Sequence, residues 1–209
     1  MTRSRFDNAA CETLAGCIKE IERTTDAELV IVVRGRSASY AHADYLFGFS
    51  IALIVLIFLL FSPYPFPEFL VPIDVAVAFV VGSIISWRSN SLRRLFSREK
   101  FRKQAVRTAA AAMFYEAGIA NTNAEMGVLI YLSLLERRLE LIADRGVLKK
   151  VPAQDWNQKL FELHQIGKHP DPKSFQIAIQ EFGKVLAANV PATGENPNEL
   201  PDMPRFELK

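Results

Sequence analysis

Four acidic or amide residues flank the predicted strands of this 209-residue chain, where their side-chain oxygens could gather into one site. They are Asp26, Asn123, Glu125 and Asp144. If the last two strands form a hairpin that turns at Leu135–Glu136, Asp144 lies opposite Gly127, close to Asn123 and Glu125. Parallel pairing of the first two strands would bring Asp26, and with it Glu28, to the same edge of the sheet. Carboxylate and amide oxygens are the ligand types that suit Mg²⁺ or Ca²⁺.

This acidic edge has a second interpretation. Asp and Asn are common in turns and helix caps, because their side chains bond to nearby backbone groups. A divalent-metal site and ordinary turn and capping chemistry therefore stand as alternatives.

The chain carries no other set of residues with a catalytic spacing. Its three histidines, His42, His164 and His169, are scattered, and it has no GxSxG, His-x-x-x-His or glycine-rich phosphate loop. Ser133 ends a predicted strand, where open α/β sheets often place function, but no histidine or carboxylate is predicted near it. We therefore name no catalytic residue and no organic cofactor.

Three short apolar runs predict the strands that would position these residues. They are Glu28–Arg34, Gly127–Ser133 and Arg138–Asp144. The first two are apolar on consecutive residues, as in strands buried on both faces, and we expect them to pair in parallel, with the third strand antiparallel to the second. The order α-β-(membrane hairpin)-α-β-β-α-α predicts an α/β fold: a small three-layer α/β/α sandwich with a short mixed sheet, interrupted by a two-helix transmembrane hairpin.

Two long apolar runs, Tyr45–Phe61 and Phe69–Trp87, predict this hairpin. The first run has no charge, and the second has only Asp74. As helices they would span roughly 25 and 28 Å, against a hydrocarbon core of about 30 Å. The linker Ser62–Glu68 holds three prolines, which favour a turn. Small residues spaced four apart predict close helix packing, either within the hairpin or between protomers.

The distribution of basic residues predicts the orientation of the hairpin. Eight Lys or Arg residues stand from Arg88 to Arg107, whereas Ser62–Glu68 has none. Both termini are therefore expected in the cytoplasm, with the protein integral to the cell (inner or plasma) membrane and without a signal peptide in Met1–Glu22. The basic run is interpreted either as a topology signal or as a segment that binds anionic lipid headgroups. Its few aromatic residues argue against a nucleic-acid partner.

These assignments divide the chain into five segments. Residues 1–40 form the first part of a split α/β domain, 45–87 the transmembrane hairpin (45–61 and 69–87), 88–103 a basic juxtamembrane segment, 104–190 the second part of the α/β domain, and 191–209 an irregular, proline-rich C-terminal tail. Neither part of the split domain holds enough apolar surface to fold alone, so we expect both to share one sheet.

The segment Thr122–Val147, TNAEMGVLIYLSLLERRLELIADRGV, resembles the middle of the TPM domain, in particular its bacterial membrane-embedded branch. The resemblance extends to ELVIVV in the first strand, to Trp156 and to NELPD at Asn198–Asp202, and covers most of residues 8–202 outside the hairpin. It implies a TPM-like α/β domain and, as in some relatives, an acidic site for a divalent metal. Members of this family have been linked to phosphatase-like hydrolysis, to metal binding and to the assembly or maintenance of membrane complexes.

Two functions from different classes follow as hypotheses. The first is a membrane-anchored, cytoplasm-facing TPM-like domain that acts as a non-enzymatic interaction or assembly module for membrane proteins. The alternative is a phosphatase-like hydrolase tethered to the membrane and dependent on Mg²⁺ or Ca²⁺. The lack of a paired base and nucleophile favours the first. Expected partners are the lipid bilayer, other membrane proteins and a second copy of the chain.

Overall fold

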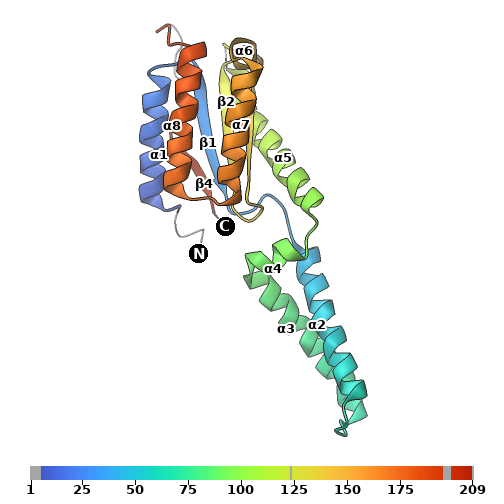
Figure 1. Ribbon diagram of the computed structural model, residues 1–209. Helices are drawn as coiled ribbons and strands as arrows, with labels where there is room; N and C mark the ends of the chain where they lie inside the picture. The colour runs from blue at the N-terminus through green and yellow to red at the C-terminus, as the bar shows by residue number, and fades with distance from the viewer. Residues whose placement is uncertain (1–5, 123, 195–198, 209) are drawn as a thin grey trace. The chain divides into compact units, whose positions relative to one another are not determined.

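The computed structural model describes residues 6–122, 124–194 and 199–208 of the chain. Within them it holds a mixed α/β arrangement of four strands and eight α-helices (Figure 1). The chain divides into two compact units. The α/β unit joins Met1–Ser37 to Lys103–Lys209, and the hairpin unit is Ala38–Arg102.

One mixed sheet forms the centre of the α/β unit, with the strand order β3-β2-β1-β4. Its strands are β1 (Glu28–Arg34), β2 (Gly127–Ser133), β3 (Arg138–Ala143) and β4 (Arg205–Glu207). β1 runs parallel to β2, with Glu28 beside Gly127 and Arg34 beside Ser133. β3 pairs with β2 in the antiparallel sense. Both predicted directions are confirmed, and the parallel pair joins chain segments from either side of the hairpin unit.

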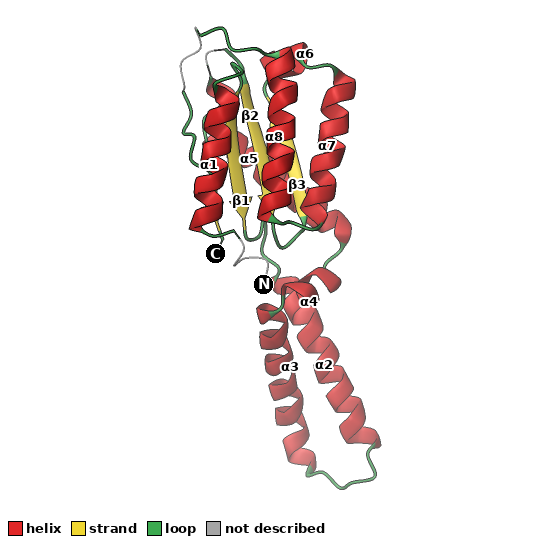
Figure 2. Ribbon diagram, turned by 60° about the vertical axis from the view of Figure 1, so that its left-hand side comes forward, coloured by secondary structure: helices red, strands yellow, loops and turns green. Residues whose placement is uncertain are grey.

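Helices lie on both faces of this sheet (Figure 2). α1 (Asn8–Glu22), α7 (Ala153–Lys168) and α8 (Pro172–Asn189) pack on one face, and α5 (Glu99–Glu116) packs on the other. Ile31 of β1 lies in the core under α1 and α8, whereas Val30 and Val32 lie in the core under α5. Because both faces are covered, β1 and β2 are apolar on consecutive residues.

Local sequence signals fix the ends of these helices. Asp7 caps α1 by accepting a hydrogen bond from the Ala10 N–H at 2.9 Å, and Asp171 caps α8 in the same way through Ser174 at 3.2 Å. Gly118 follows α5 with a φ of 75°, a left-handed conformation that glycine adopts readily at the end of a helix. The caps set where each helix starts or ends, and so which of its side chains meet the sheet.

The interpretation of residues 191–209 as an irregular tail was wrong at two points. Pro191 forms an isolated antiparallel bridge to Thr25, and β4 adds a fourth strand parallel to β1. A three-residue strand is too short to show a period in the sequence, and its partner is distant along the chain. A short helix that was not predicted, α6 (Arg145–Lys150), also follows β3.

The hairpin unit holds α2 (Ala41–Phe61) and α3 (Val71–Arg88), which are joined through a turn of 3₁₀ helix, η2 (Glu68–Leu70). Two helical stretches of 21 residues, Ala41–Phe61 and Glu68–Arg88, are long and apolar enough to cross a membrane. A short helix, α4 (Asn90–Leu95), follows α3.

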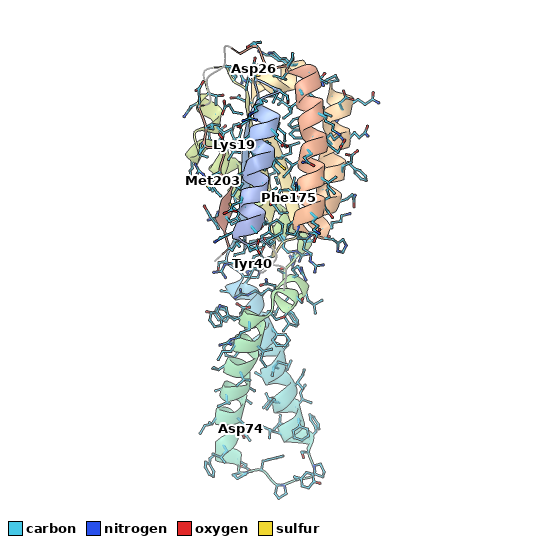
Figure 3. The ribbon with its side chains drawn as sticks, turned by 90° about the vertical axis from the view of Figure 1, so that its left-hand side faces the viewer. Lys19, Asp26, Tyr40, Asp74, Phe175 and Met203 are labelled. Carbon is cyan, nitrogen blue, oxygen red and sulfur yellow. The ribbon has the colours of Figure 1, made fainter. Side chains whose placement is uncertain are left out.

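Small residues let α2 and α3 approach closely. A Cβ added at Gly82 would lie 3.0 Å from the Gly48 Cα and 3.1 Å from the Ile51 Cβ. The close packing that the small residues predict therefore occurs within the hairpin. Asp74 lies in the first turn of α3, near the loop end of the hairpin (Figure 3).

Candidate functional site

The acidic edge of the sheet lies where β1 and β2 begin and β3 ends. The Asp144 N–H donates a hydrogen bond to the Gly127 carbonyl at 2.8 Å, which confirms that Asp144 lies opposite the start of β2. Asp144 Oδ1 accepts a hydrogen bond from the Arg145 N–H at 2.7 Å and caps α6. Asp144 Oδ2 is buried and has no hydrogen-bond partner within the described part of the chain.

The other predicted ligands are placed differently. Glu125 lies in the turn before β2 with a φ of 53°, and its carbonyl accepts a hydrogen bond from the Gly146 N–H at 3.0 Å. Asp26 lies beyond the C-terminal end of α1 (Figure 3), and its carboxylate accepts hydrogen bonds from Thr193 N at 2.9 Å and Thr193 Oγ1 at 2.8 Å. Asn123 lies outside the described residues. Among the residues that the structure describes, no three His, Cys, Asp or Glu side chains are grouped to hold a metal ion, so the Mg²⁺ or Ca²⁺ site stays a prediction.

Two more acids lie at the same edge: Glu28, which the parallel pairing was expected to bring there, and Glu22, which was not predicted. Glu22 Oε1 accepts a hydrogen bond from the Leu29 N–H at 2.9 Å, and the Glu28 carboxylate accepts one from the Leu200 N–H at 3.2 Å. Burial, together with the nearby carboxylates of Glu28 and Asp202, raises the pKa of Glu22 to about 8. Burial raises the pKa of Glu28 as well. For Glu28 the sequence signal was a carboxylate at the first position of a strand whose next residues, 29–33, are all apolar.

A second polar cluster lies at the opposite edge, where the parallel strands β1 and β2 end. Ser37 Oγ donates to Ser133 Oγ at 2.9 Å, and Ser133 Oγ donates to the Glu136 carboxylate. The Ser37 backbone N–H donates to the other Glu136 oxygen at 2.8 Å. The Tyr131 hydroxyl lies 3.0 Å from Ser37 Oγ. Because the single hydroxyl proton of Ser37 goes to Ser133, Tyr131 is the donor in that contact.

The hydrogen bonds of this cluster run in one direction, from a cation to an anion. The Arg34 guanidinium, which can only donate, contacts the Tyr131 hydroxyl and pairs with Glu207 of β4 at 3.0 Å. Tyr131 in turn donates to Ser37, Ser37 donates to Ser133, and Ser133 donates to Glu136. Burial raises the pKa of Tyr131, which keeps its hydroxyl protonated near neutral pH. The residues Arg34, Ser37, Tyr131, Ser133 and Glu136 form the carboxyl-edge network.

Ser133 is not available to a substrate in the carboxyl-edge network. Its side chain is fully buried, and its hydroxyl both donates and accepts a hydrogen bond. The expectation that no carboxylate lies near Ser133 was wrong, because the turn after β2 brings Glu136 back onto it. The network ties the ends of β1 and β2 to this turn and to the residues that leave β1.

One buried ion pair organises the hairpin unit. Arg93 of α4 binds Asp44 of α2 through Nη2 to Oδ2 at 2.7 Å and Nε to Oδ1 at 2.9 Å. Ser86 of α3 donates to Asp44 Oδ1 at 2.8 Å. Asp44 and Arg93 are each only 5% exposed. The pair therefore joins three helices, and loss of one partner would leave a buried charge without compensation.

The free energy of unfolding is expected to fall as the pH rises from about 5 to about 8, because of Glu22. Its folded-state pKa is about 8 against an ordinary value of 4.5, so in this range the folded protein keeps a proton that the unfolded chain has lost. Denaturant unfolding against pH should show this slope in the wild type and a weaker slope in Glu22→Gln. Glu181→Gln, at an exposed position of α8, is the control and should keep the wild-type slope. Equal slopes for wild type and Glu22→Gln would contradict the assignment.

Ser133 and Glu136 are expected to be energetically coupled. Ser133→Ala removes a donor to the Glu136 carboxylate, and Glu136→Gln removes the charge that the donors of Ser37 and Ser133 bind. Each variant should lower the free energy of unfolding by about 1–3 kcal/mol. The loss in the free energy of unfolding of the double variant should differ by at least about 0.5 kcal/mol from the sum of the two single losses. Denaturant unfolding in detergent measures all three. Strictly additive losses would show that the two side chains act independently.

No family model matches the chain, and no curated protein matches it. The chain is similar to the NMR structure of the BA42 protein from the psychrophilic bacterium Bizionia argentinensis. That alignment covers 96% of this chain and 94% of the BA42 chain, with a TM-score of 0.56 and 13% sequence identity. At this level of identity the likeness shows a shared α/β fold and nothing of the chemistry.

Proposed function

We propose that this chain is an integral protein of the cell membrane, with both termini in the cytoplasm, and that its α/β unit acts as a non-enzymatic interaction or assembly module for other membrane proteins. The observation that carries the proposal is the exposed surface of the hairpin unit. On α2, Phe58 is 61% exposed, Leu60 is 65% exposed and Phe61 is 81% exposed. Exposing apolar surface to water costs about 25 cal/mol of free energy per Å². In a bilayer the same surface contacts apolar acyl chains, and this cost is avoided.

The polar side chains of the two helices support a membrane span. Asp44 lies in the first turn of α2 and is paired with Arg93, and Asp74 lies in the first turn of α3. An ionisable group is tolerated near the interface or in a pair, and is costly at the bilayer centre. The orientation is supported by the excess of Lys and Arg after α3 and by their absence from the loop Ser62–Glu68.

The same proposal assigns the α/β unit to the TPM-like domains, as a three-layer α/β/α sandwich. The segment that resembles the family, Thr122–Val147, contains β2, β3 and the turn between them. Helices on both faces of the sheet support the layered arrangement.

A non-enzymatic role is supported by the way polar groups at both edges of the sheet are engaged. Ser133 is enclosed in the carboxyl-edge network, and the Asp26 carboxylate binds the backbone and side chain of Thr193. These groups hold segments of the chain together.

One observation favours the alternative function, a metal-dependent hydrolase. The buried Asp144 Oδ2 lacks a hydrogen-bond partner within the described residues, and a hard cation would suit such an oxygen. Asp144, with Glu125 from the neighbouring turn, would hold this cation, which would supply a Lewis acid for a phosphoryl oxygen. Hydrolysis of a generic phosphate ester in Mg²⁺ or Ca²⁺, lost in Asp144→Asn, would favour the hydrolase and contradict the non-enzymatic role.

An engineered Pro65→Cys is expected to react with a membrane-impermeant maleimide in intact cells, and Lys168→Cys is not. The first position lies in the loop of the hairpin unit, and the second lies in the α/β unit. Both variants are made in a chain with Cys11→Ala and Cys17→Ala, so that no native thiol reacts. After cell lysis both positions should react, which controls for accessibility. Reaction at position 168 in intact cells, or release of the chain from membranes by alkaline carbonate, would contradict the proposal.

A further inference from the structure

The basic segment after α3 divides its charges between the interior and the surface of the hairpin unit. Arg93 is buried in the ion pair with Asp44. The Arg102 guanidinium donates to the Arg94 carbonyl at 2.6 Å and to Ser97 Oγ at 3.1 Å, just after the end of α4. These two cations hold together parts of the hairpin unit.

Between the end of α3 and the start of α5, three cations and three apolar side chains are each exposed. The cations are Arg88, Arg98 and Lys100. The apolar residues are Trp87, 58% exposed, Leu95, 76% exposed, and Phe101, 42% exposed. We name these six residues the juxtamembrane patch. A single acid, Glu99, stands in residues 88–107, so the segment is strongly basic.

The juxtamembrane patch includes the last two residues of α3, Trp87 and Arg88, and Leu95 of α4. α4 is held at the end of the hairpin opposite its loop by the Asp44–Arg93 pair and by the contact of Phe96 with Phe47, whose ring centres are 5.2 Å apart (Figure 1). If α2 and α3 span the bilayer, this end reaches the level of the headgroups. Aromatic and basic side chains that alternate at that level are typical of membrane interfaces.

We propose that the juxtamembrane patch binds the headgroups of anionic phospholipids, an inference that rests on the proposed membrane anchoring. Arg88, Arg98 and Lys100 supply charge for the lipid phosphates, and Trp87 and Leu95 reach the boundary of the acyl chains. A topology signal requires only basic residues near the end of a span. It does not require exposed apolar side chains among them, and the patch has three.

The test measures which lipid the full-length protein holds at its surface. The protein is reconstituted into phosphatidylcholine bilayers with a trace of spin-labelled phosphatidylglycerol or spin-labelled phosphatidylcholine. Electron spin resonance gives the motionally restricted fraction of each label. At low salt we expect phosphatidylglycerol to associate at least about threefold more strongly than phosphatidylcholine, and the ratio should fall in high salt.

Three sets of variants locate the effect. Arg88→Gln, Arg98→Gln and Lys100→Gln together should bring the ratio close to one. The charge-matched control, Lys149→Gln, Lys150→Gln and Lys173→Gln in the α/β unit, should keep the wild-type ratio. Arg88→Lys with Arg98→Lys keeps the charge and should keep the ratio, which separates headgroup attraction from a disturbed hairpin unit.

Equal association of both lipids with the wild type, in protein that resists alkaline carbonate extraction, would overturn the lipid site and leave the membrane anchoring intact. A loss of the ratio in the α/β-unit control would overturn it as well, since net charge would then be the cause. If inorganic phosphate abolishes the ratio more than sodium chloride of equal ionic strength does, the patch binds free phosphate and the proposal fails. Protein that never enters the bilayer would contradict the membrane anchoring itself.

Discussion

The parallel pairing of β1 with β2 is the contact on which the α/β unit depends. β1 comes from the chain before the hairpin unit and lies between β2 and β4, which both come from the chain after it. Ile31, Val32 and Val33 of β1 are completely buried. Burying one such side chain is worth about 1.5–3 kcal/mol, and the chain before the hairpin cannot supply that burial alone. The α/β unit therefore forms only when both segments are present.

Polar groups fix the register of this pairing at both edges of the sheet. At the acidic edge, Glu28 begins β1 and binds the backbone around Leu200. At the other edge, the carboxyl-edge network crosses from β1 to β2 and ends on Glu136. Both faces of β1 are apolar, so the apolar pattern alone does not fix the register, whereas a slip of one residue would break both sets of hydrogen bonds. The Asp44–Arg93 pair holds the hairpin unit together in a similar way, within its own three helices.

Long apolar runs made most of the architecture predictable. The three longer strands, the helices around them and the two long helices of the hairpin each leave a local pattern in the sequence, and the structure contains them. β4 and α6 were not predicted, because segments of three and six residues are too short to show a helix or strand periodicity.

The basic run was predictable as a cluster of charge, but the separation of Arg93 from its exposed neighbours depends on Asp44, 49 residues away. Likewise, no sequence motif predicted that the turn after β2 would bring Glu136 back to Ser133. The position of the acidic edge in the sheet was predicted, but the hydrogen-bond partners of its residues were not. Side-chain pairing between distant segments leaves no local signal in the sequence.

The central claim is that one α/β unit is assembled across an inserted hairpin. The most direct measurement is amide hydrogen exchange on a chain in which residues 38–102 are replaced by a short Gly-Ser linker. We expect this chain to be soluble without detergent, and the amides of β1 to exchange as slowly as those of β2, in one cooperative unit. Rapid exchange in residues 29–33, with protection kept in residues 128–132, would contradict a shared sheet.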